Sequence, residues 1–273
     1  MNANTKDRDD QIEKLYTEDG LSYRAIGSKI GVSETTVHHA LKKRGIKRLD
    51  LEVYDRDYFK KIDSERKAYV LGFFFADGSV SLKKCSIRLR LAEKDKEILL
   101  KIADELKITK PLKYFCQGGR YPSWELAFYG IDVCRDLIDL GCVCAKSDKL
   151  VFPKIRKDLV RHFIRGYFDG DGCIAIDYKR KRSHISICST PAFNEGILQF
   201  LRVNSKIGGG IYNHKEIKNY CEIDICGMNQ SVEFFNLIYK GATIYLQRKF
   251  DKFQEVIKIN GEKKLRRSKF NPA

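Results

Sequence analysis

Hydrophobic and polar residues follow the same order of periodicities twice along the chain, once over residues 64–150 and once over residues 151–258. Alternation at every second residue is typical of strands with one buried face, and recurrence at every third or fourth residue is typical of helices. Each copy is therefore predicted to run helix-strand-strand-helix-strand-strand-helix. The expected strands are 80–82, 87–91, 112–116, 124–129, 174–178, 184–188, 207–213 and 221–225, and the helices that follow the first one of each copy are 95–106, 132–140, 191–203, 229–239 and 246–257.

This order predicts an α+β fold in which pseudo-twofold tandem αββαββα repeats form a saddle of two antiparallel sheets. Helices cover the apolar face of each sheet and leave a polar concave face open. The strand over 87–91 illustrates the pattern, because Ile87 and Leu89 fall on one face while Arg88 and Arg90 fall on the other.

One phrase of the sequence occurs in both copies, 94 residues apart, as expected for a structural repeat. Residues 69–78 read Tyr-Val-Leu-Gly-Phe-Phe-Phe-Ala-Asp-Gly, and residues 163–172 read Phe-Ile-Arg-Gly-Tyr-Phe-Asp-Gly-Asp-Gly. A glycine inside a helix costs about 1 kcal/mol relative to alanine, so Gly72 and Gly166 are expected where the two helices pack against each other. Each helix is predicted to end at a left-handed glycine, Gly78 or Gly172.

Each of these helices also ends with an aspartate, Asp77 or Asp171. A carboxylate at the negative pole of a helix dipole is unfavourable by about 0.3–1 kcal/mol, and two such ends side by side repel each other. The arrangement is reasonable if divalent cations bind between the carboxylates. For either copy alone, an apolar core helix that ends in an Asp-Gly turn is the alternative.

The two phrases resemble the motif of the LAGLIDADG homing endonucleases, over Leu71–Gly78 and Ile164–Gly172. The resemblance continues in residues 59–63, 67–69, 146–153 and 245–249, and covers roughly residues 55 to 258. One position departs from the motif: Phe75 stands where its first aspartate would be, whereas the second copy has Asp169. The final acids, which are the catalytic ones in this family, are both present.

The resemblance implies a monomeric, site-specific endonuclease that cuts both strands of DNA at a long asymmetric target and leaves 3′ overhangs. Asp77 and Asp171 would hold Mg²⁺, with Mn²⁺ or Ca²⁺ as substitutes in a crystal, assisted by the main-chain carbonyls of Ala76 and Gly170. Lys146 and Lys249 correspond to basic residues of the catalytic pocket, although both could equally be surface lysines. Such enzymes are encoded by introns, phages or free-standing mobile elements.

Residues 1–48 predict a separate small helical domain, followed by a linker over 49–63. Helices are expected from Asp9, after an N-cap at Ser22, and after an N-cap at Ser33. Small Gly27, turn-forming Gly31 and apolar Val37 have the spacing of a helix-turn-helix, whose second helix enters the major groove. A protein-binding helical module is the alternative. The outward side chains of the third helix would be Glu34, Thr35, His38, His39 and Lys42.

The net charge of +16 and the pI of about 9.4 indicate a polyanionic partner. Double-stranded DNA fits better than a membrane, because a span needs about 20 consecutive apolar residues and the sequence has no such stretch. Basic residues occur at corresponding hairpin turns, where they would hold phosphates, unless these turns are merely solvated. These candidates are Lys83 and Lys84 in the first turn, Lys179, Arg180, Lys181 and Arg182 in the second, and Arg88 and Arg90 on the adjoining strand.

The nine scattered cysteines favour a reducing compartment, and we expect a cytoplasmic, nucleoid-associated protein of bacterial or phage origin. A basic tail is expected over 259–273. Two other functions remain open. A DNA-binding transcription regulator could use the same fold, although retention of both acids weighs against it. An RNA maturase that assists intron splicing is the third possibility.

Overall fold

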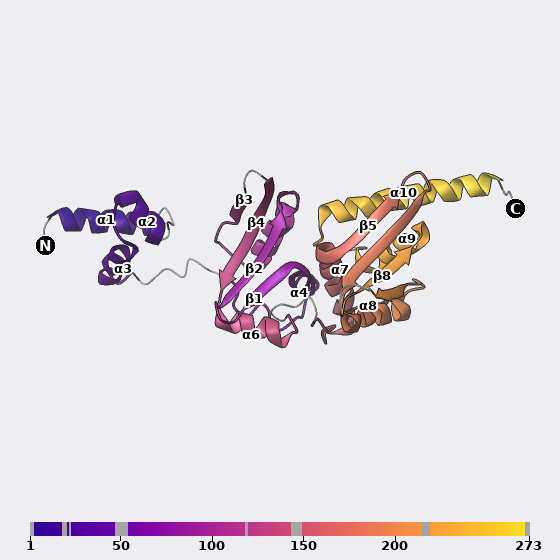
Figure 1. Cartoon of the computed structure of the whole chain (residues 1–273), viewed down its shortest axis with the longest axis horizontal. Helices are drawn as coiled ribbons and strands as arrows, with labels where there is room; N and C mark the ends of the chain where they lie inside the picture. Colours follow the sequence, from indigo (N-terminus) through magenta and orange to yellow (C-terminus); the bar gives the residue numbers. More distant parts are fainter. Residues whose placement is uncertain are drawn as a thin grey trace. The chain divides into compact units, whose positions relative to one another are not determined.

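The computed structural model describes residues 3–17, 21, 23–46, 54–117, 120–142, 149–213 and 219–270, with side chains for 5–262 of these (Figure 1). The chain divides into two compact units, Met1–Tyr54 and Asp55–Ala273, and each is described here by itself. The described part of the chain contains ten α-helices and two four-stranded antiparallel sheets, which confirms the predicted α+β fold.

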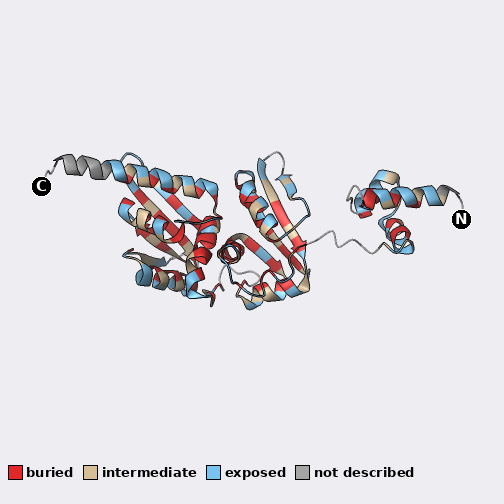
Figure 2. Cartoon of the chain, turned by 180° about the vertical axis from the view of Figure 1, so that it is seen from behind, coloured by how far each residue is buried: buried red, intermediate tan, exposed pale blue. Residues whose placement is uncertain are grey.

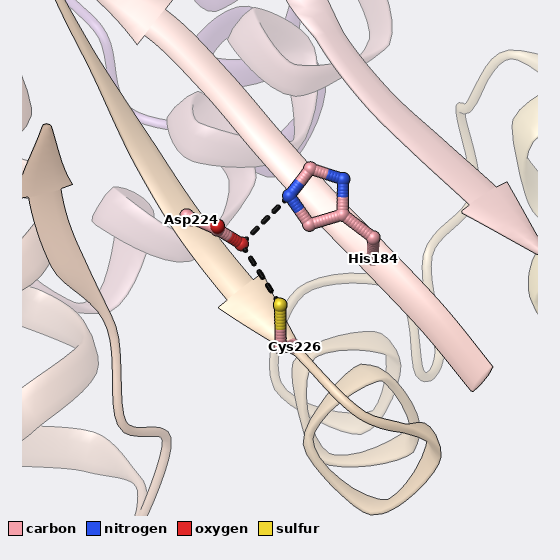
Figure 3. A group of neighbouring side chains, drawn as sticks. All are labelled: His184, Asp224 and Cys226. Carbon is pink, nitrogen blue, oxygen red and sulfur yellow. Dashed lines mark hydrogen bonds and ion pairs between the residues drawn. The ribbon is translucent and has the colours of Figure 1, made fainter.

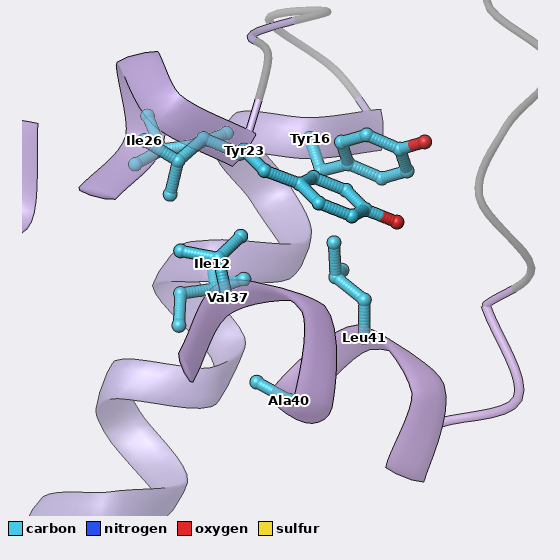
Figure 4. Close-up of a cluster of buried hydrophobic side chains, with 8 residues drawn as sticks. Ile12, Tyr16, Tyr23, Ile26, Val37, Ala40 and Leu41 are labelled. Carbon is cyan, nitrogen blue, oxygen red and sulfur yellow. The ribbon is translucent and has the colours of Figure 1, made fainter. Parts of the chain in front are cut away.

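The first unit consists of the helices α1 (Ala3–Thr17), α2 (Tyr23–Ile30) and α3 (Glu34–Lys43). Their apolar faces meet in one small core, which includes Ile12, Ile26 and Val37 (Figure 4). The predicted cap is present at Ser33, whose hydroxyl accepts a hydrogen bond from the amide of Thr36 at 3.1 Å. The cap predicted at Ser22 lies outside the described residues.

Glycines permit the sharp connection between α2 and α3. Gly31 has a φ of +73°, in the left-handed region that glycine adopts without strain. A β-carbon on Gly27 would lie only 2.5 Å from the carbonyl oxygen of Val32, so a larger residue would push the two helices apart.

The second unit contains the repeat, and both halves have the predicted order of elements. The first sheet has the strand order β1-β2-β4-β3 and the second has the matching order β5-β6-β8-β7. The first half consists of α4 (Glu65–Asp77), β1 (Gly78–Ser81), β2 (Ser86–Ala92), α5 (Lys96–Glu105), β3 (Lys113–Gln117), β4 (Arg120–Tyr129) and α6 (Ile131–Asp139). The second half consists of α7 (Val160–Asp171), β5 (Gly172–Asp177), β6 (Arg182–Ser189), α8 (Pro191–Asn204), β7 (Gly210–Asn213), β8 (Cys221–Cys226) and α9 (Met228–Ile238).

Each sheet buries one face against the helices of its own half. In the first half α5 and α6 contact the sheet, and in the second α8 and α9 do so. On β2 the residues Ile87 and Leu89 are buried, whereas Arg90 on the opposite face is exposed. Buried and more exposed residues alternate along the strands of both sheets (Figure 2). Helices α4 and α7 lie side by side between the two sheets (Figure 1).

The ends of α4 and α7 differ from the prediction. Gly78 and Gly172 are not left-handed caps, because their backbones are extended, with φ of −72° and −78°, and each begins a strand. Glycine is needed there for a different reason. A β-carbon on Gly78 would lie 2.5 Å from the ring of Phe74, and one on Gly172 would collide with the ring of Phe168.

The last helix is longer than the predicted range of 246–257. Helix α10 runs from Gln247 to Phe270, so the segment expected to be a tail from residue 259 is helical up to Phe270. Its sequence is rich in lysine and arginine, which are good helix formers, and the first proline after it is Pro272. Among the described residues, none of the helices is both long and apolar enough to span a membrane.

Candidate active site

Helices α4 and α7 approach each other through the two repeated glycines. A β-carbon on Gly72 would collide with the carbonyl oxygen of Phe163 and lie 2.9 Å from the amide nitrogen of Tyr167. A β-carbon on Gly166 would collide with the carbonyl of Tyr69 in the same way. The contacts are equivalent in the two directions, so the glycines set the separation of the helices and fix their ends relative to each other.

The motif aspartates lie where these two helices end. Asp77 is half-buried and Asp171 is exposed, so water and ions can reach both carboxylates. Asp77 also lies against the opposite helix: a β-carbon on Gly170, the residue that precedes Asp171, would be 2.8 Å from its Oδ2. The paired helices therefore bring one accessible acid from each copy to the same end of the helix pair.

The ammonium group of Lys249 lies beneath this end and is almost fully buried. It donates hydrogen bonds to the carbonyls of Phe168 at 2.5 Å, Gly172 at 2.5 Å and Gly170 at 3.3 Å. These are carbonyls at the negative pole of α7, where a cation is favourable. Burial lowers the pKa of Lys249 to about 8, while Asp169, Asp77 and Asp171 oppose that shift.

The two carbonyls predicted to assist a metal differ in their surroundings. Gly170 already accepts the long hydrogen bond from Lys249, although a carbonyl oxygen has a second lone pair for another partner. Ala76 lies at the contact between the helices, where its β-carbon faces Gly170. The other basic candidate, Lys146, falls outside the described residues.

Asp169 has a role that the sequence did not reveal. It is buried, and its carboxylate accepts hydrogen bonds from the hydroxyl of Tyr69 at 2.8 Å, the hydroxyl of Tyr239 at 2.5 Å and the amide of Leu246 at 2.7 Å. Burial raises the pKa of Asp169 despite these bonds and the nearby ammonium of Lys249. It holds α4, α9 and the start of α10 together and is inaccessible to a solvent cation.

A pocket of about 250 Å³ opens beside Asp171, and most of its lining residues were not predicted from the sequence. Tyr167, Cys188 and Tyr220 contribute to the walls together with Phe75. The Tyr167 hydroxyl donates to the carbonyl of Cys188 at 3.0 Å. Burial raises the pKa of Tyr220 to about 12, so its hydroxyl stays protonated at neutral pH. The pocket therefore offers polar groups next to the acid.

The basic candidates of the second unit lie on turns and on one open sheet face. The turns after β1 and β5 both end in a left-handed residue, Cys85 and Lys181, so the two hairpins have similar shapes. Arg90 pairs with Glu125 at 2.9 Å and stacks on Phe115, and Arg88 is only partly exposed. The exposed turn and strand-end candidates are Lys83, Lys84, Lys179, Arg180 and Arg182.

The candidates of the first unit share one surface of α3. Thr35, His38, His39 and Lys42 are all exposed, while Val37 and Leu41 between them are buried. The end of α3 is held to α1 because Arg44 forms ion pairs with Asp10 and Glu13. The outer face of α3 is therefore exposed, and ion pairs tie the end of this helix to α1.

Known proteins share this architecture. Residues 158–239 match the LAGLIDADG-like domain family. The second unit resembles the LAGLIDADG homing endonuclease I-GzeII, solved in complex with its DNA target, with a TM-score of 0.51 at 10% identity over 74% of this chain and 91% of that chain. The full-length DUF199/WhiA protein from Thermatoga maritima is also similar, with a TM-score of 0.46 at 18% identity over 74% of this chain and 64% of that one.

A sequence relative comes from a different class of protein. The probable translation initiation factor IF-2 of Methanocaldococcus jannaschii is 28% identical over 183 residues, which are 62% of this chain. The chain spans only 14% of that relative's length. Residues 158–239 thus match the LAGLIDADG-like domain family, and the repeated unit has the LAGLIDADG fold. The resemblance drawn from the two sequence motifs is confirmed.

Proposed function

We propose that this protein is a homing endonuclease that hydrolyses both strands of a long, asymmetric DNA target and leaves 3′ overhangs. The observation that carries the proposal is the convergence of two accessible aspartates, Asp77 and Asp171, at one end of a glycine-packed helix pair. Each of these aspartates would support the hydrolysis of one of the two DNA strands. The fold similarity to a LAGLIDADG endonuclease in complex with DNA supports the same conclusion.

The donors at this end of the helices fit Mg²⁺. Mg²⁺ prefers oxygen ligands and is usually held by one or two carboxylates, with water and substrate oxygens completing its shell. Asp77 and Asp171 supply such carboxylates, and the carbonyls of Ala76 and Gly170 are neighbouring oxygens. When bound, the ion would neutralise charge on the phosphate and on the leaving oxygen.

The protein's own residues position these acids and the DNA. Gly72 and Gly166 set the distance between the two helix ends, and Asp169 locks α7 to α4 through Tyr69. Lys249 is a positioning residue in this proposal, because its ammonium group is almost fully buried and donates its hydrogen bonds to carbonyls at the end of α7. It would keep the main chain beside Asp171 in place without touching the phosphate.

The basic hairpins would hold the backbone of the duplex on either side of the cut. Lysines and arginines at turns contact phosphates more often than bases, whereas strand residues in the major groove read base edges. Arg88 and Arg90 would read bases from the first sheet. The exposed face of α3 would add a second DNA contact as a helix-turn-helix. We place the protein as a monomer in the cytoplasm of a bacterium or of a phage-infected cell.

Incubating the full chain with DNA from both flanks of its own gene, with and without Mg²⁺, tests the proposal. We expect a double-strand cut at one site that appears only with the divalent ion, and sequencing of the ends should show 3′ overhangs. Binding to that DNA without cleavage at any divalent concentration would contradict the enzyme and favour a DNA-binding regulator. Restored splicing of an intron without DNA cleavage would favour a maturase.

A further inference from the structure

Three side chains with metal-binding atoms meet on the open face of the second sheet, and none belongs to the motif site. His184 on β6 and Cys226 on β8 are directly opposite in the register, and Asp224 lies two residues before Cys226 on the same face (Figure 3). The His184 Nε2 is 2.7 Å from the Asp224 Oδ1, which is 3.2 Å from the Cys226 Sγ. All three ligand atoms lie within 4.8 Å of one another.

The nitrogen–oxygen and sulfur–oxygen separations are close to those around a tetrahedral ion. With Zn–N, Zn–O and Zn–S bonds of about 2.0–2.3 Å, neighbouring ligand atoms are about 3.3–3.7 Å apart. The nitrogen–oxygen and sulfur–oxygen distances need to open by only about 0.4–0.6 Å, which side-chain rotation can supply. Both strands are central in the sheet, since β6 pairs with β5 and β8, so the backbone beneath the cluster is fixed.

The donor types select the metal. A thiolate, an imidazole and one carboxylate form a set that binds Zn²⁺, whereas Mg²⁺ favours oxygen donors alone.

An open pocket of about 600 Å³ adjoins the cluster and is lined by His184, Cys226 and Asp177 among others. Asp177 is not a ready fourth ligand, because its Oδ1 accepts a hydrogen bond from the amide of Arg180 at 2.9 Å. Among the described residues this cluster has three ligands, so water or a ligand oxygen would complete the shell. Three protein ligands with one open position is the pattern of reactive zinc sites.

We propose that His184, Asp224 and Cys226 form a Zn²⁺ site with an open fourth position, separate from the site of the motif aspartates. Zinc would also neutralise the negative charge of the cluster, because Zn²⁺ bound to the Asp224 carboxylate and the Cys226 thiolate forms a group with no net charge. Besides Asp224, the same sheet face carries Asp177 and Glu222 as well as Arg182. Removal of one negative charge here would make the face more attractive to a DNA phosphate, a consequence that rests on the proposed function.

Titration of the metal-free full chain with Co²⁺ tests the site without any DNA. Cobalt in a tetrahedral site with a thiolate ligand gives an intense sulfur-to-metal charge-transfer band and strong visible d–d bands. We expect one equivalent of this signal in the wild type, displaced by Zn²⁺ and unaffected by excess Mg²⁺. The equivalent should disappear in Cys226→Ser and fall at least tenfold in affinity in His184→Gln.

Cys173→Ser is the matched control, since Cys173 is an exposed cysteine on the neighbouring strand β5 of the same sheet. It should retain the full signal. A wild-type titration without a charge-transfer band, or a band that survives Cys226→Ser, would overturn the site and leave a plain His–Asp ion pair with a hydrogen-bonded thiol.

A second measurement separates this proposal from the nuclease proposal. With the metal site established by cobalt, Zn²⁺ should tighten binding of duplex DNA by about 3–10-fold in the wild type and not in Cys226→Ser. Cobalt binding without any effect on DNA would keep the site and remove only its role at the DNA surface. Mg²⁺-dependent cleavage by Cys226→Ser would show that the nuclease centre is independent of it.

Discussion

The two motif helices share a glycine where they approach each other most closely, but they have different residues two positions before the shared acids. Phe75 on α4 and Asp169 on α7 occupy equivalent places, and each contacts the equivalent residue of the other helix. The Phe75 ring packs edge-on against Phe163 with centroids 5.1 Å apart, whereas Asp169 accepts a hydrogen bond from Tyr69 at 2.8 Å. One side of the pseudo-twofold axis is therefore apolar and the other polar.

The surroundings of each position explain which residues of the repeat must be the same in both halves. Gly72 and Gly166 face a backbone and Asp77 and Asp171 face solvent, so both halves need the same residue at these positions. Position 75 or 169 faces a side chain, so a matched pair of either chemistry can fill it. On the polar side, Tyr239 and the amide of Leu246 complete the set of donors to Asp169.

Replacing the apolar Phe75 by an acid should have the largest effect on stability. Phe75→Asp would bury a carboxyl group among Phe163 and Phe193 with no hydroxyl opposite, and would leave a cavity as well. We expect a loss of at least about 4 kcal/mol in the free energy of unfolding, measured by urea denaturation. A loss below 1 kcal/mol would show that the pairing is not selective.

Adding Phe163→Tyr to that variant would recreate the acid–hydroxyl pair of the other side. The double-mutant cycle should give a favourable coupling energy of about 1–2 kcal/mol, because one charge-assisted hydrogen bond is restored but its two companions are not. A coupling energy of zero would contradict the equivalence of the two sides.

Removing the acid on the polar side should cost somewhat less. Asp169→Leu leaves the hydroxyls of Tyr69 and Tyr239 and the amide of Leu246 buried without their acceptor. We expect about 3–4 kcal/mol of destabilisation by urea denaturation. Asp251→Asn, on the exposed side of α10, is the control and should change stability by less than about 0.5 kcal/mol.

Gly72 and Gly166 are positions at which the two halves are alike, and substitutions there should lower stability equally. Gly72→Ala and Gly166→Ala each place a methyl group against a carbonyl oxygen of the opposite helix, and a backbone cannot rotate away as a side chain can. The cost should be about 2–3 kcal/mol for each, after the gain of about 1 kcal/mol in helix propensity. Clearly unequal melting temperatures for the two variants would argue against a symmetric contact.

The smallest expected effect is a pH dependence of the free energy of unfolding that arises from His162, which has no counterpart in the first half. Burial and the neighbouring Arg165 lower the pKa of His162 to about 4, and its Nδ1 lies 2.9 Å from the Arg165 guanidinium, from which the neutral ring accepts. The unfolded chain binds this proton near pH 6.5 and the folded one only near pH 4, so stability falls as the pH is lowered across that window.

The loss from this group should be about 2 kcal/mol, and it should be absent in His162→Gln, whose side chain can still accept the hydrogen bond but does not titrate. Urea midpoints at pH 7 and pH 4.5 for both proteins measure the difference. Equal acid destabilisation of the two would remove His162 as the cause.

Much of the fold followed from local patterns, but the hydrogen-bonded core of the site did not. The repeat, the strand alternation around Arg88 and the cap at Ser33 depend on residues close in sequence. The partners of Asp169 lie 70 to 100 residues away in the chain, and no local pattern predicts them. The error at Gly78 has a different, local origin, since the glycine admits the ring of Phe74 four residues earlier, which a backbone-capping rule does not consider.

The candidate site was predictable in part for the same reason. Asp77 and Asp171 stood out because the same acid ends two matching segments. Burial of Lys249 beneath α7, and the meeting of His184 with Cys226 across two strands, depend on tertiary packing and strand register. The register between two strands can be assigned only once the order of the strands in the sheet is known.

Cleavage by Asp77→Asn and Asp171→Asn shows whether these two aspartates cut the DNA. The assay uses the target located in the DNA around the gene. Asp251→Asn serves as the control, and circular dichroism should show that all three variants keep the wild-type fold. If two accessible acids converge to serve one strand each, both motif variants should lose double-strand cutting by at least about 100-fold, with Asp251→Asn unchanged. Double-strand cutting at the wild-type rate by either motif variant would contradict the account.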